Sequence, residues 1–426
     1  MSSSLFARPE GNNPVPVYLV LMAGQAFCFS LFFTVHLIYQ VTVVGLNPFQ
    51  LVLVGTVLEV TVFLFEVPTG ILADVYSRRV SILVGITLIG CAYILEGGIA
   101  AFWAALVGQV FWGVGYTFTS GATEAWITDE IGEGAVGPVF LRGRQMWLIG
   151  GLVGTLACVS LGYINYQLPM ILAGVGMLAL APALALVMPE RHMQPIPPAA
   201  RSTFGHMKVT AREGFRLAMT RPVVRVIIAI SLVAGLAAEA FDRLRVPSVI
   251  NRFDFPVVFG SGSPLIWFGV SGMIGTLLGV AASEVLKRRN PAALGPGTPA
   301  RLLAICSAIQ VAVVVVFALS GSLWLAFGVL WIGAIVDSVS QPVESAWLNR
   351  NLDASTRATV ISMTGQANSI GQATGGPALG WVGNTVSIRA ALLCSALVLS
   401  PTIALYRHLI IRRDRGAVEP VAAPAD

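Results

Sequence analysis

The chain has 426 residues, of which 56% are hydrophobic and 11% are charged. Soluble domains of ordinary composition are roughly 25% charged, so a water-soluble fold of this length is excluded. The charged residues also cluster between long apolar stretches, which is the pattern of a polytopic helical membrane protein. Nucleic-acid binding and cytosolic enzyme chemistry are therefore not expected.

Twelve apolar stretches are candidates for membrane spans, each of which takes about 20 residues. They predict an all-α protein with an N-terminal six-helix bundle, residues 1–190, and a C-terminal six-helix bundle, residues 222–411. A cytoplasmic linker, 191–221, joins the bundles, and a cytoplasmic tail, 412–426, follows them. The expected spans are residues 15–43, 48–73, 80–95, 99–128, 139–163, 168–188, 222–246, 264–286, 301–320, 323–348, 356–382 and 388–411.

The basic residues predict the orientation of the chain, because Lys and Arg are retained on the cytoplasmic side. When successive loops are assigned to alternate sides, all but four of the 26 Lys and Arg residues fall on one side. We therefore expect a multi-pass membrane protein with both termini in the cytoplasm. The four exceptions are Arg243, Arg245, Arg252 and Arg389.

The central linker has a periodic pattern that predicts an amphipathic helix on the inner membrane surface. Apolar residues recur at spacings of three and four, and basic residues recur every four beside them. A solvated basic linker is the alternative. The apolar positions are Phe204, Met207, Ala211, Phe215 and Ala218, and the basic positions are Lys208, Arg212 and Arg216.

Weak internal repeats indicate duplicated halves. Residues 74–79 resemble residues 284–289 at an offset of 210. Further pairs share an offset of 221, and a longer loop in the second half accounts for the difference. These pairs are Ala125 with Ala346, Trp126 with Trp347, Gln145 with Gln366, Gly150 with Gly371, and Gly154 with Gly375. The repeats predict that the two six-helix bundles are pseudo-symmetric.

The strongest local motif lies between the second and third spans, at residues 66–79. Gly70 permits close helix approach, and Asp74 can accept hydrogen bonds from a neighbouring helix N-terminus. Arg78 and Arg79 can pair with acids across the cytoplasmic face, although a plain positive-inside anchor is the alternative. We predict a gate formed by Gly70, Asp74, Arg78, Arg79, Asp129 and Glu130.

This motif resembles the Gly-x-Leu-Ala-Asp-x-x-x-Arg-Arg loop of the major facilitator superfamily. The resemblance implies twelve spans in two halves, alternating access by rocking of the halves, and a substrate site between them at mid-membrane. Residues 66–70 and 120–126 look most similar to bacterial drug-efflux and macrolide-efflux-like members, a resemblance that implies a location in the bacterial inner (plasma) membrane. The matching residues of the loop are Gly70, Leu72, Ala73, Asp74, Arg78 and Arg79.

Two departures separate the chain from proton-coupled drug antiporters of that superfamily. Those proteins have an arginine in span four where this chain has Gln109. They also have a Gly-Pro motif in span five, where residues 150–154 lack the proline. Residues 371–380 in span eleven look like a displaced version, with close helix packing and a proline kink as the alternative. The resemblance therefore supports transport more strongly than antiport.

Carboxylates inside spans are candidates for proton or cation binding, because an unpaired charge in hydrocarbon costs several kcal/mol. Glu59 lies near the middle of span two, with Glu66 on about the same face, and Asp337 lies near the middle of span ten. A structural role beside Ser or Gln is the alternative. Glu124 and Glu344, near the cytoplasmic ends of spans four and ten, are further candidates for proton coupling or substrate binding, although salt bridges at the inner face are expected there.

Two further groups are candidates for gating and substrate binding. A charged cluster at the outer end of span seven suggests an outer gate or vestibule, with a local ion-pair network as the alternative. Aromatic residues of spans four and ten could stack on lipophilic or cationic substrates, or could face lipid. His36, also near the outer side, stands alone in the sequence and is expected as a hydrogen-bonded packing residue, with a pH switch as the alternative. The charged residues are Glu239, Asp242, Arg243 and Arg245, and the aromatic residues are Trp112, Tyr116, Phe118 and Trp331.

The sequence has no phosphate-binding loop, catalytic triad or metal-ligand set, and its five cysteines lie singly in apolar stretches. We therefore expect neither an enzyme nor a cofactor or bound metal. The leading hypothesis is a monomeric secondary active transporter that exports lipophilic or amphiphilic small molecules in exchange for protons or another ion, as multidrug-efflux proteins do. The alternatives are uptake or uniport of a nutrient or metabolite, and a lipid flippase or scramblase.

Overall fold

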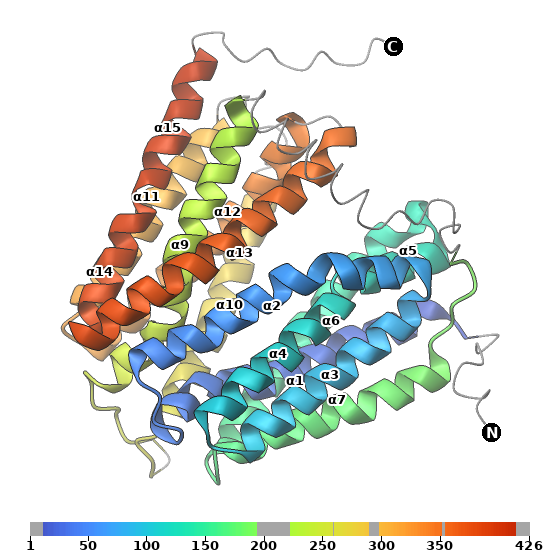
Figure 1. Ribbon diagram of the computed structural model, residues 1–426, viewed down its shortest axis with the longest axis horizontal. Helices are drawn as coiled ribbons and strands as arrows, with labels where there is room; N and C mark the ends of the chain where they lie inside the picture. The colour runs from blue at the N-terminus through green and yellow to red at the C-terminus, as the bar shows by residue number, and fades with distance from the viewer. Residues whose placement is uncertain (1–11, 194–221, 259, 289–297, 352–353, 415–426) are drawn as a thin grey trace. The chain divides into compact units, whose positions relative to one another are not determined.

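The computed structural model describes residues 12–193, 222–258, 260–288, 298–351 and 354–414 (Figure 1). This part of the chain contains fourteen helices and no β-strand. The predicted amphipathic linker helix, 204–218, lies outside it. The helices are α1 (Pro14–Thr42), α2 (Pro48–Val75), α3 (Arg78–Gly98), α4 (Phe102–Thr119), α5 (Ala122–Ile131), α6 (Glu133–Gly162), α7 (Gln167–Val187), α9 (Pro222–Ile250), α10 (Pro264–Arg288), α11 (Thr298–Leu319), α12 (Leu323–Asn351), α13 (Ala354–Thr385), α14 (Ile388–Leu399) and α15 (Pro401–Asp414).

The helices group into two compact units. Unit 1 contains α1, most of α2, and α3 to α7, together with the first turns of α10. Unit 2 contains α9, the rest of α10, and α11 to α15. Unit 2 also includes a short stretch of α2, Leu51–Thr56, which packs against helices of that unit.

Each of the twelve predicted spans corresponds to a helix or to a pair of consecutive helices. Ten of the described helical segments are long and apolar enough to cross a membrane. The other two predicted spans, 99–128 and 356–382, correspond to α4 with α5 and to α13. The 32-residue α13 is long enough, so its polar composition, rich in Gly, Ser, Thr, Asn and Gln, separates it from the ten.

The prediction of one continuous span over 99–128 is wrong, because the helix breaks after Thr119. Ser120 has an extended backbone, and Gly121 has a φ of 72°, a left-handed conformation that glycine adopts without steric cost. The ten-residue α5 then ends at Gly132, whose φ is 83°. Span 388–411 is likewise divided, at Ser400, before Pro401 opens α15.

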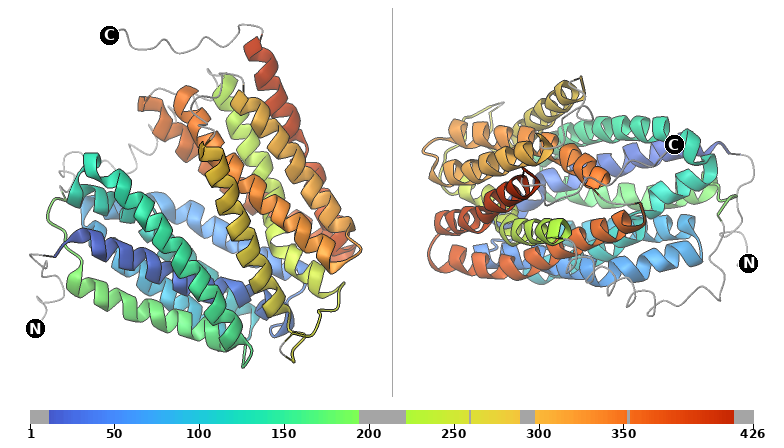
Figure 2. Two further views of the ribbon diagram at one scale, coloured as in Figure 1. Left: turned by 180° about the vertical axis from the view of Figure 1, so that it is seen from behind. Right: turned by 90° about the horizontal axis from the view of Figure 1, so that it is seen from above.

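Glycines allow α6 to pack closely along α1 in unit 1 (Figure 2). A Cβ added to Gly150 would overlap the carbonyl oxygen of Ala23, and one added to Gly154 would overlap that of Phe27. The helix backbones are therefore in contact at these two turns, as in other small-residue helix interfaces.

The same arrangement recurs in unit 2, between α13 and α9. Gly371 lies against the carbonyl oxygen of Leu232, and Gly375 against that of Leu236. Gly371 and Gly375 are the partners that the 221-residue offset assigned to the two glycines of α6. The repeat thus corresponds to the same packing contact in each bundle, consistent with the predicted pseudo-symmetry.

Candidate functional site

The sharp reversal between α2 and α3 places the predicted gating arginines in the first turn of α3. The α2 helix ends at Val75, and Ser77 begins the next helix by accepting a hydrogen bond from the backbone amide of Val80 at 3.0 Å. This serine cap is a common helix start. Arg78 and Arg79 follow at once, so the short connection fixes where both side chains begin.

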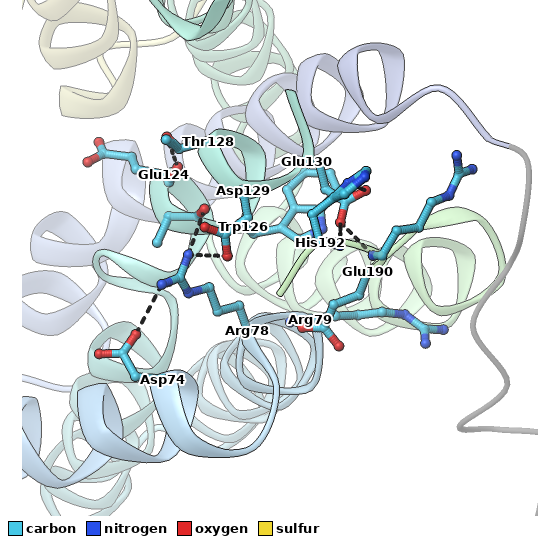
Figure 3. Close-up of polar contacts among 12 residues, drawn as sticks. Asp74, Arg78, Arg79, Glu124, Trp126, Thr128, Asp129, Glu130, Glu190 and His192 are labelled. Carbon is cyan, nitrogen blue, oxygen red and sulfur yellow. Dashed lines mark hydrogen bonds and ion pairs between the residues drawn. The ribbon is translucent and has the colours of Figure 1, made fainter. Parts of the chain in front are cut away.

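Arg78 joins α2, α3 and α5 through one guanidinium group (Figure 3). Its Nη1 donates to Oδ2 of Asp129 and, at 2.9 Å, to the carbonyl oxygen of Ala125. Its Nη2 lies 3.5 Å from Oδ1 of Asp74. We call these four residues the Arg78 bridge. The contact with Asp129 is one that the sequence suggested.

Arg79 occupies a different, buried environment. Its backbone amide donates to Oε1 of Glu190 at 3.0 Å, and its Nη2 donates to the carbonyl oxygen of Ala185 in the last turn of α7. The second carboxylate oxygen of Glu190 accepts a 2.7 Å hydrogen bond from the Ser77 hydroxyl. Glu190 therefore caps the N-terminus of α3, where a negative charge is favourable, while Arg79 complements the C-terminus of α7.

The segment after α7 is held against α5 by two further residues. Glu130 accepts hydrogen bonds from the backbone amides of Arg191, at 2.6 Å, and His192, at 3.2 Å. The indole of Trp126 donates to the carbonyl oxygen of Pro189 at 2.6 Å. Glu130 thus anchors a backbone segment. Sequence analysis missed Glu190, although a carboxylate directly after an apolar span was a visible signal.

Three predicted residues near the bridge lie in open positions. A Cβ added to Gly70 would meet no atom within 4 Å among the described residues, so the close helix approach expected there is not found. Glu124 is exposed, and Figure 3 shows its carboxylate directed away from Arg78. Glu66 is also exposed, whereas Glu59, two turns earlier on α2, is half-buried.

Asp337 lies at the midpoint of α12 in unit 2. Its Oδ1 accepts a hydrogen bond from the side-chain amide of Gln310 on α11. Asp242 and Arg245 of α9 lie within electrostatic range of the carboxylate. Glu344, seven residues further along α12, is half-buried. The structure therefore brings Asp337 together with one pair of the charged residues predicted for the outer gate.

The other pair predicted for the outer gate is buried. Arg243 Nε donates to Oε1 of Glu239 at 2.8 Å, and the two residues are 9% and 3% exposed. A Cβ on Gly55 of α2 would overlap both of these atoms, and Gly376 of α13 lies against the Glu239 side chain. In contrast, the Asp242–Arg245 pair, at 3.5 Å, is about half exposed. The four charges thus form two separate pairs.

Trp112 and Tyr116 of α4 belong to an aromatic group in unit 1. Their rings stack with centroids 5.5 Å apart. Phe33 of α1 meets the Trp112 ring edge-on at 5.5 Å, and Phe29 lies 6.5 Å from it and 6.1 Å from Trp147 of α6. We call these five residues the aromatic wall. In unit 2, Trp331 donates from its indole to Ser271 of α10.

His36 is a buried, hydrogen-bonded residue, and its partners could not be read from the sequence. Its Nε2 lies 2.7 Å from Oε1 of Glu96, a buried carboxylate near the end of α3. Gln40 and Gln109 donate to the same carboxylate. Gln109, the residue in place of the arginine of drug antiporters, is therefore part of a buried polar network. Sequence analysis missed Glu96 because it precedes Gly97 and Gly98, which suggested a loop.

A comparison with protein families matches residues 15–376 to the Major Facilitator Superfamily. The chain belongs to the major facilitator superfamily. As a superfamily transporter it is a multi-span membrane protein and not an enzyme, in agreement with the sequence analysis.

Other comparisons agree with superfamily membership. The chain is 22% identical over 369 residues to the protein named "Uncharacterized MFS-type transporter YxaM" from Bacillus subtilis (strain 168), covering 84% of this chain and 86% of the relative. The fold is similar to that of a mutant of the nucleoside transporter NupG, with a TM-score of 0.73, 14% identity, and coverage of 93% of this chain and 100% of that one. A peptide transporter POT in complex with sulfate gives a TM-score of 0.76 at 14% identity, with 98% of each chain covered.

Proposed function

We propose that this superfamily transporter exports lipophilic or amphiphilic small molecules in exchange for protons, by alternating access. The observation on which the proposal rests is the position of Asp337. It lies 14 residues from each end of α12, or about 21 Å from each end at 1.5 Å per residue. The Asp337 side chain is exposed in the structure. A carboxylate at that depth is costly when charged unless water or a partner reaches it, so a change in its surroundings favours binding or release of a proton.

The neighbours of Asp337 suit such a change. Gln310 donates to the carboxylate but brings no charge, and Arg245 is balanced by its own partner, Asp242. Among the described residues, the charge of Asp337 is therefore not permanently neutralised by a dedicated cation. A proton, or a cationic substrate that competes with the proton, supplies the missing charge in this mechanism.

The aromatic wall supports a lipophilic or cationic substrate. Tyr116 is 42% exposed, and its ring stacks directly on the half-buried Trp112. Aromatic faces attract organic cations and add apolar contact area. A substrate that contacts this wall requires no directional hydrogen bonds, which fits a compound class defined by shape and lipophilicity.

The Arg78 bridge supports a gate on the cytoplasmic side, given the orientation predicted from the basic residues. Its partners are partly exposed, with side-chain exposures of 49% for Asp74 and 26% for Asp129. Exposed ion pairs contribute about 0–1 kcal/mol each, so they can break and re-form during a transport cycle. The buried Glu239–Arg243 pair is the corresponding candidate for the outer gate.

The proposal is tested with purified protein in liposomes that have a pH gradient. We expect tetraphenylphosphonium or macrolide-like compounds to dissipate the gradient, and Asp337→Asn to abolish this flux. Glu133→Gln, the same chemical change at an exposed position outside the apolar part of α6, is the matched control and should transport normally. No flux with any compound, from folded protein, would refute export by proton exchange and favour uptake, uniport or lipid movement.

A further inference from the structure

The interior of unit 1 contains four polar side chains that the proposed transport site does not use. His36 and Gln40 belong to α1, Glu96 to α3 and Gln109 to α4, and their exposures are 0%, 0%, 2% and 2%. We call these residues the Glu96 network. Burying polar groups is unfavourable unless they are paired, so their pairing decides which protonation states the network can adopt.

The contacts around Glu96 form a closed triangle. Its Oε1 lies 2.7 Å from His36 Nε2 and 2.6 Å from Gln40 Nε2, and those two nitrogens are 2.9 Å apart. Its Oε2 accepts from Gln109 Nε2 at 3.2 Å. A carboxylate oxygen can accept from both nitrogens of the triangle. His36 Nε2 and Gln40 Nε2 cannot both donate a hydrogen to each other. The hydrogen bonds of the triangle therefore depend on whether His36 Nε2 carries a hydrogen.

Among the described residues, no permanent cation neutralises Glu96. In α1, α3, α4 and α7, the only basic side chains besides His36 are Arg78 and Arg79. They lie at the opposite end of α3, about 26 Å away along the helix. The charged residues of α6, which packs on α1, lie within residues 133–144, far along that helix from Cys158, which contacts the backbone of Val35.

The remaining titratable neighbours are neutral groups. They are Tyr39 and Cys28 on α1, Tyr93 on α3 and Cys158 on α6. An ionised Glu96 beside a neutral His36 would therefore be an isolated charge in a desolvated interior, at a cost of several kcal/mol. One additional proton removes this charge imbalance, either on His36 or on Glu96.

We propose that the Glu96 network is a proton-binding site, linked to the aromatic wall, in addition to Asp337; this deepens the proposed proton exchange and rests on it. The network accommodates the proton in two ways. In the first, protonated His36 donates from Nε2 to ionised Glu96, and its buried Nδ1–H has no acceptor among the described residues. In the second, neutral Glu96 donates to a rotated Gln40 amide. The second arrangement is available because Gln40 Oε1 and Gln109 Oε1 are buried acceptors without a hydrogen-bond partner in the described structure.

A continuous set of ring contacts connects this site to the aromatic wall. Phe32 stacks on His36 at 4.8 Å and on Tyr93 at 3.9 Å. The Tyr93 hydroxyl accepts a 3.3 Å hydrogen bond from the indole of Trp112. A ring face stabilises a cation more than a neutral group. A substrate that displaces Trp112 would thus move Tyr93 and Phe32 and change the affinity of His36 for its proton.

The proton-binding claim is tested first, without substrate. The chain has four histidines, so His192→Gln, His206→Gln and His408→Gln together leave His36 as the one isotope-labelled imidazole, with the network intact. We expect its magnetic-resonance signal to titrate, and Glu96→Gln in the same background to shift or abolish the titration. In the matched control, Asp337→Asn, the titration should persist.

Infrared difference spectra across the same pH range detect the other arrangement, because a neutral Glu96 gives a carboxyl band that Glu96→Gln removes. The inference is overturned if His36 does not titrate and no such band is present. The link to substrate is tested by adding tetraphenylphosphonium. It should shift the midpoint of the His36 titration in the protein that retains Trp112, and should shift it less in Trp112→Phe.

These outcomes separate the two proposals. A titrating network in a protein that shows no proton flux in liposomes would refute the proposed exchange and leave the proton site standing. The opposite result would refute the inference and still support proton exchange. In that result, flux is lost in Asp337→Asn but unchanged in Glu96→Gln and His36→Gln, and neither a His36 titration nor a Glu96 carboxyl band is detected.

Discussion

Gly55→Ala is expected to destabilise the protein by disrupting the buried ion pair of unit 2. A Cβ at this position of α2 would overlap Oε1 of Glu239 and Nε of Arg243, the two atoms joined by the 2.8 Å hydrogen bond. One of the two side chains must move. Both are almost inaccessible to solvent, so the displaced charge loses its partner without gaining water.

The magnitude follows from three contributions. A hydrogen bond to a charged group is worth about 1.5–3 kcal/mol, and inserting a methyl group into a packed site costs about 1–3 kcal/mol. Replacing glycine by alanine in a helix favours folding by about 0.5–1 kcal/mol. We therefore expect the free energy of unfolding to fall by about 2–5 kcal/mol for Gly55→Ala.

Unfolding of purified protein in detergent, followed by circular dichroism, measures this change. Gly70→Ala is the matched control on the same helix, because a Cβ there meets no described atom within 4 Å. It should be neutral or slightly stabilising. In a Glu239→Ala background the penalty of Gly55→Ala should fall, since the overlapping carboxylate is absent and the Arg243 side chain, no longer bonded to it, can move away from the added Cβ. An equal penalty in both backgrounds would refute the overlap as its cause.

Three further outcomes are expected. Arg78→Lys retains the charge but cannot reach Asp74, Ala125 and Asp129 together, so the transport rate in liposomes should fall about tenfold. Adding Asp129→Asn to this variant should lower the rate little further. A full additional loss in the double variant would contradict the Arg78 bridge. Glu190→Ala removes the cap of α3 and should cost about 1–2 kcal/mol, seen as faster hydrogen exchange at the amides of residues 79–81, with Glu133→Ala unchanged. Gly150→Ala and Gly371→Ala should each destabilise the protein by about 1–3 kcal/mol, because their Cβ atoms overlap the backbone of the neighbouring helix. Gly365→Ala, with no described atom within 4 Å of its Cβ, should not. Equal stability of all three variants would argue against the packing contact.

The positions of most spans were predictable because length and apolar composition identify most segments that cross a membrane. The breaks in two of them were not. Gly121 occurs inside the predicted span 99–128, and the pattern does not distinguish a glycine with a left-handed backbone from one that packs inside a helix. Gly150 and Gly371 show the opposite case, since their repeat offset did indicate a shared role.

The candidate site was predictable where residues cluster in sequence. Asp74 and Arg78 stand out because they belong to one motif, residues 66–79, and Asp129 because it is an acid at the cytoplasmic end of span four. Glu96 and Glu190 are single carboxylates next to span ends, where sequence suggests solvent. Their burial depends on which helices surround them. The four-residue spacing of His36 and Gln40 on α1 was the one local signal of the Glu96 network.

The polar composition of α13 has a consequence for biogenesis. A segment that is too polar to partition into lipid alone has to enter the bilayer against a helix that is already there. The contact of Gly371 and Gly375 with the α9 backbone, together with the 3.3 Å hydrogen bond from Asn368 to the Ser231 carbonyl oxygen, makes α9 that helix. The ribosome synthesises α9 more than a hundred residues before α13. Insertion of α13 therefore depends on α9 being in the membrane already, and a chain that loses this contact should insert incorrectly.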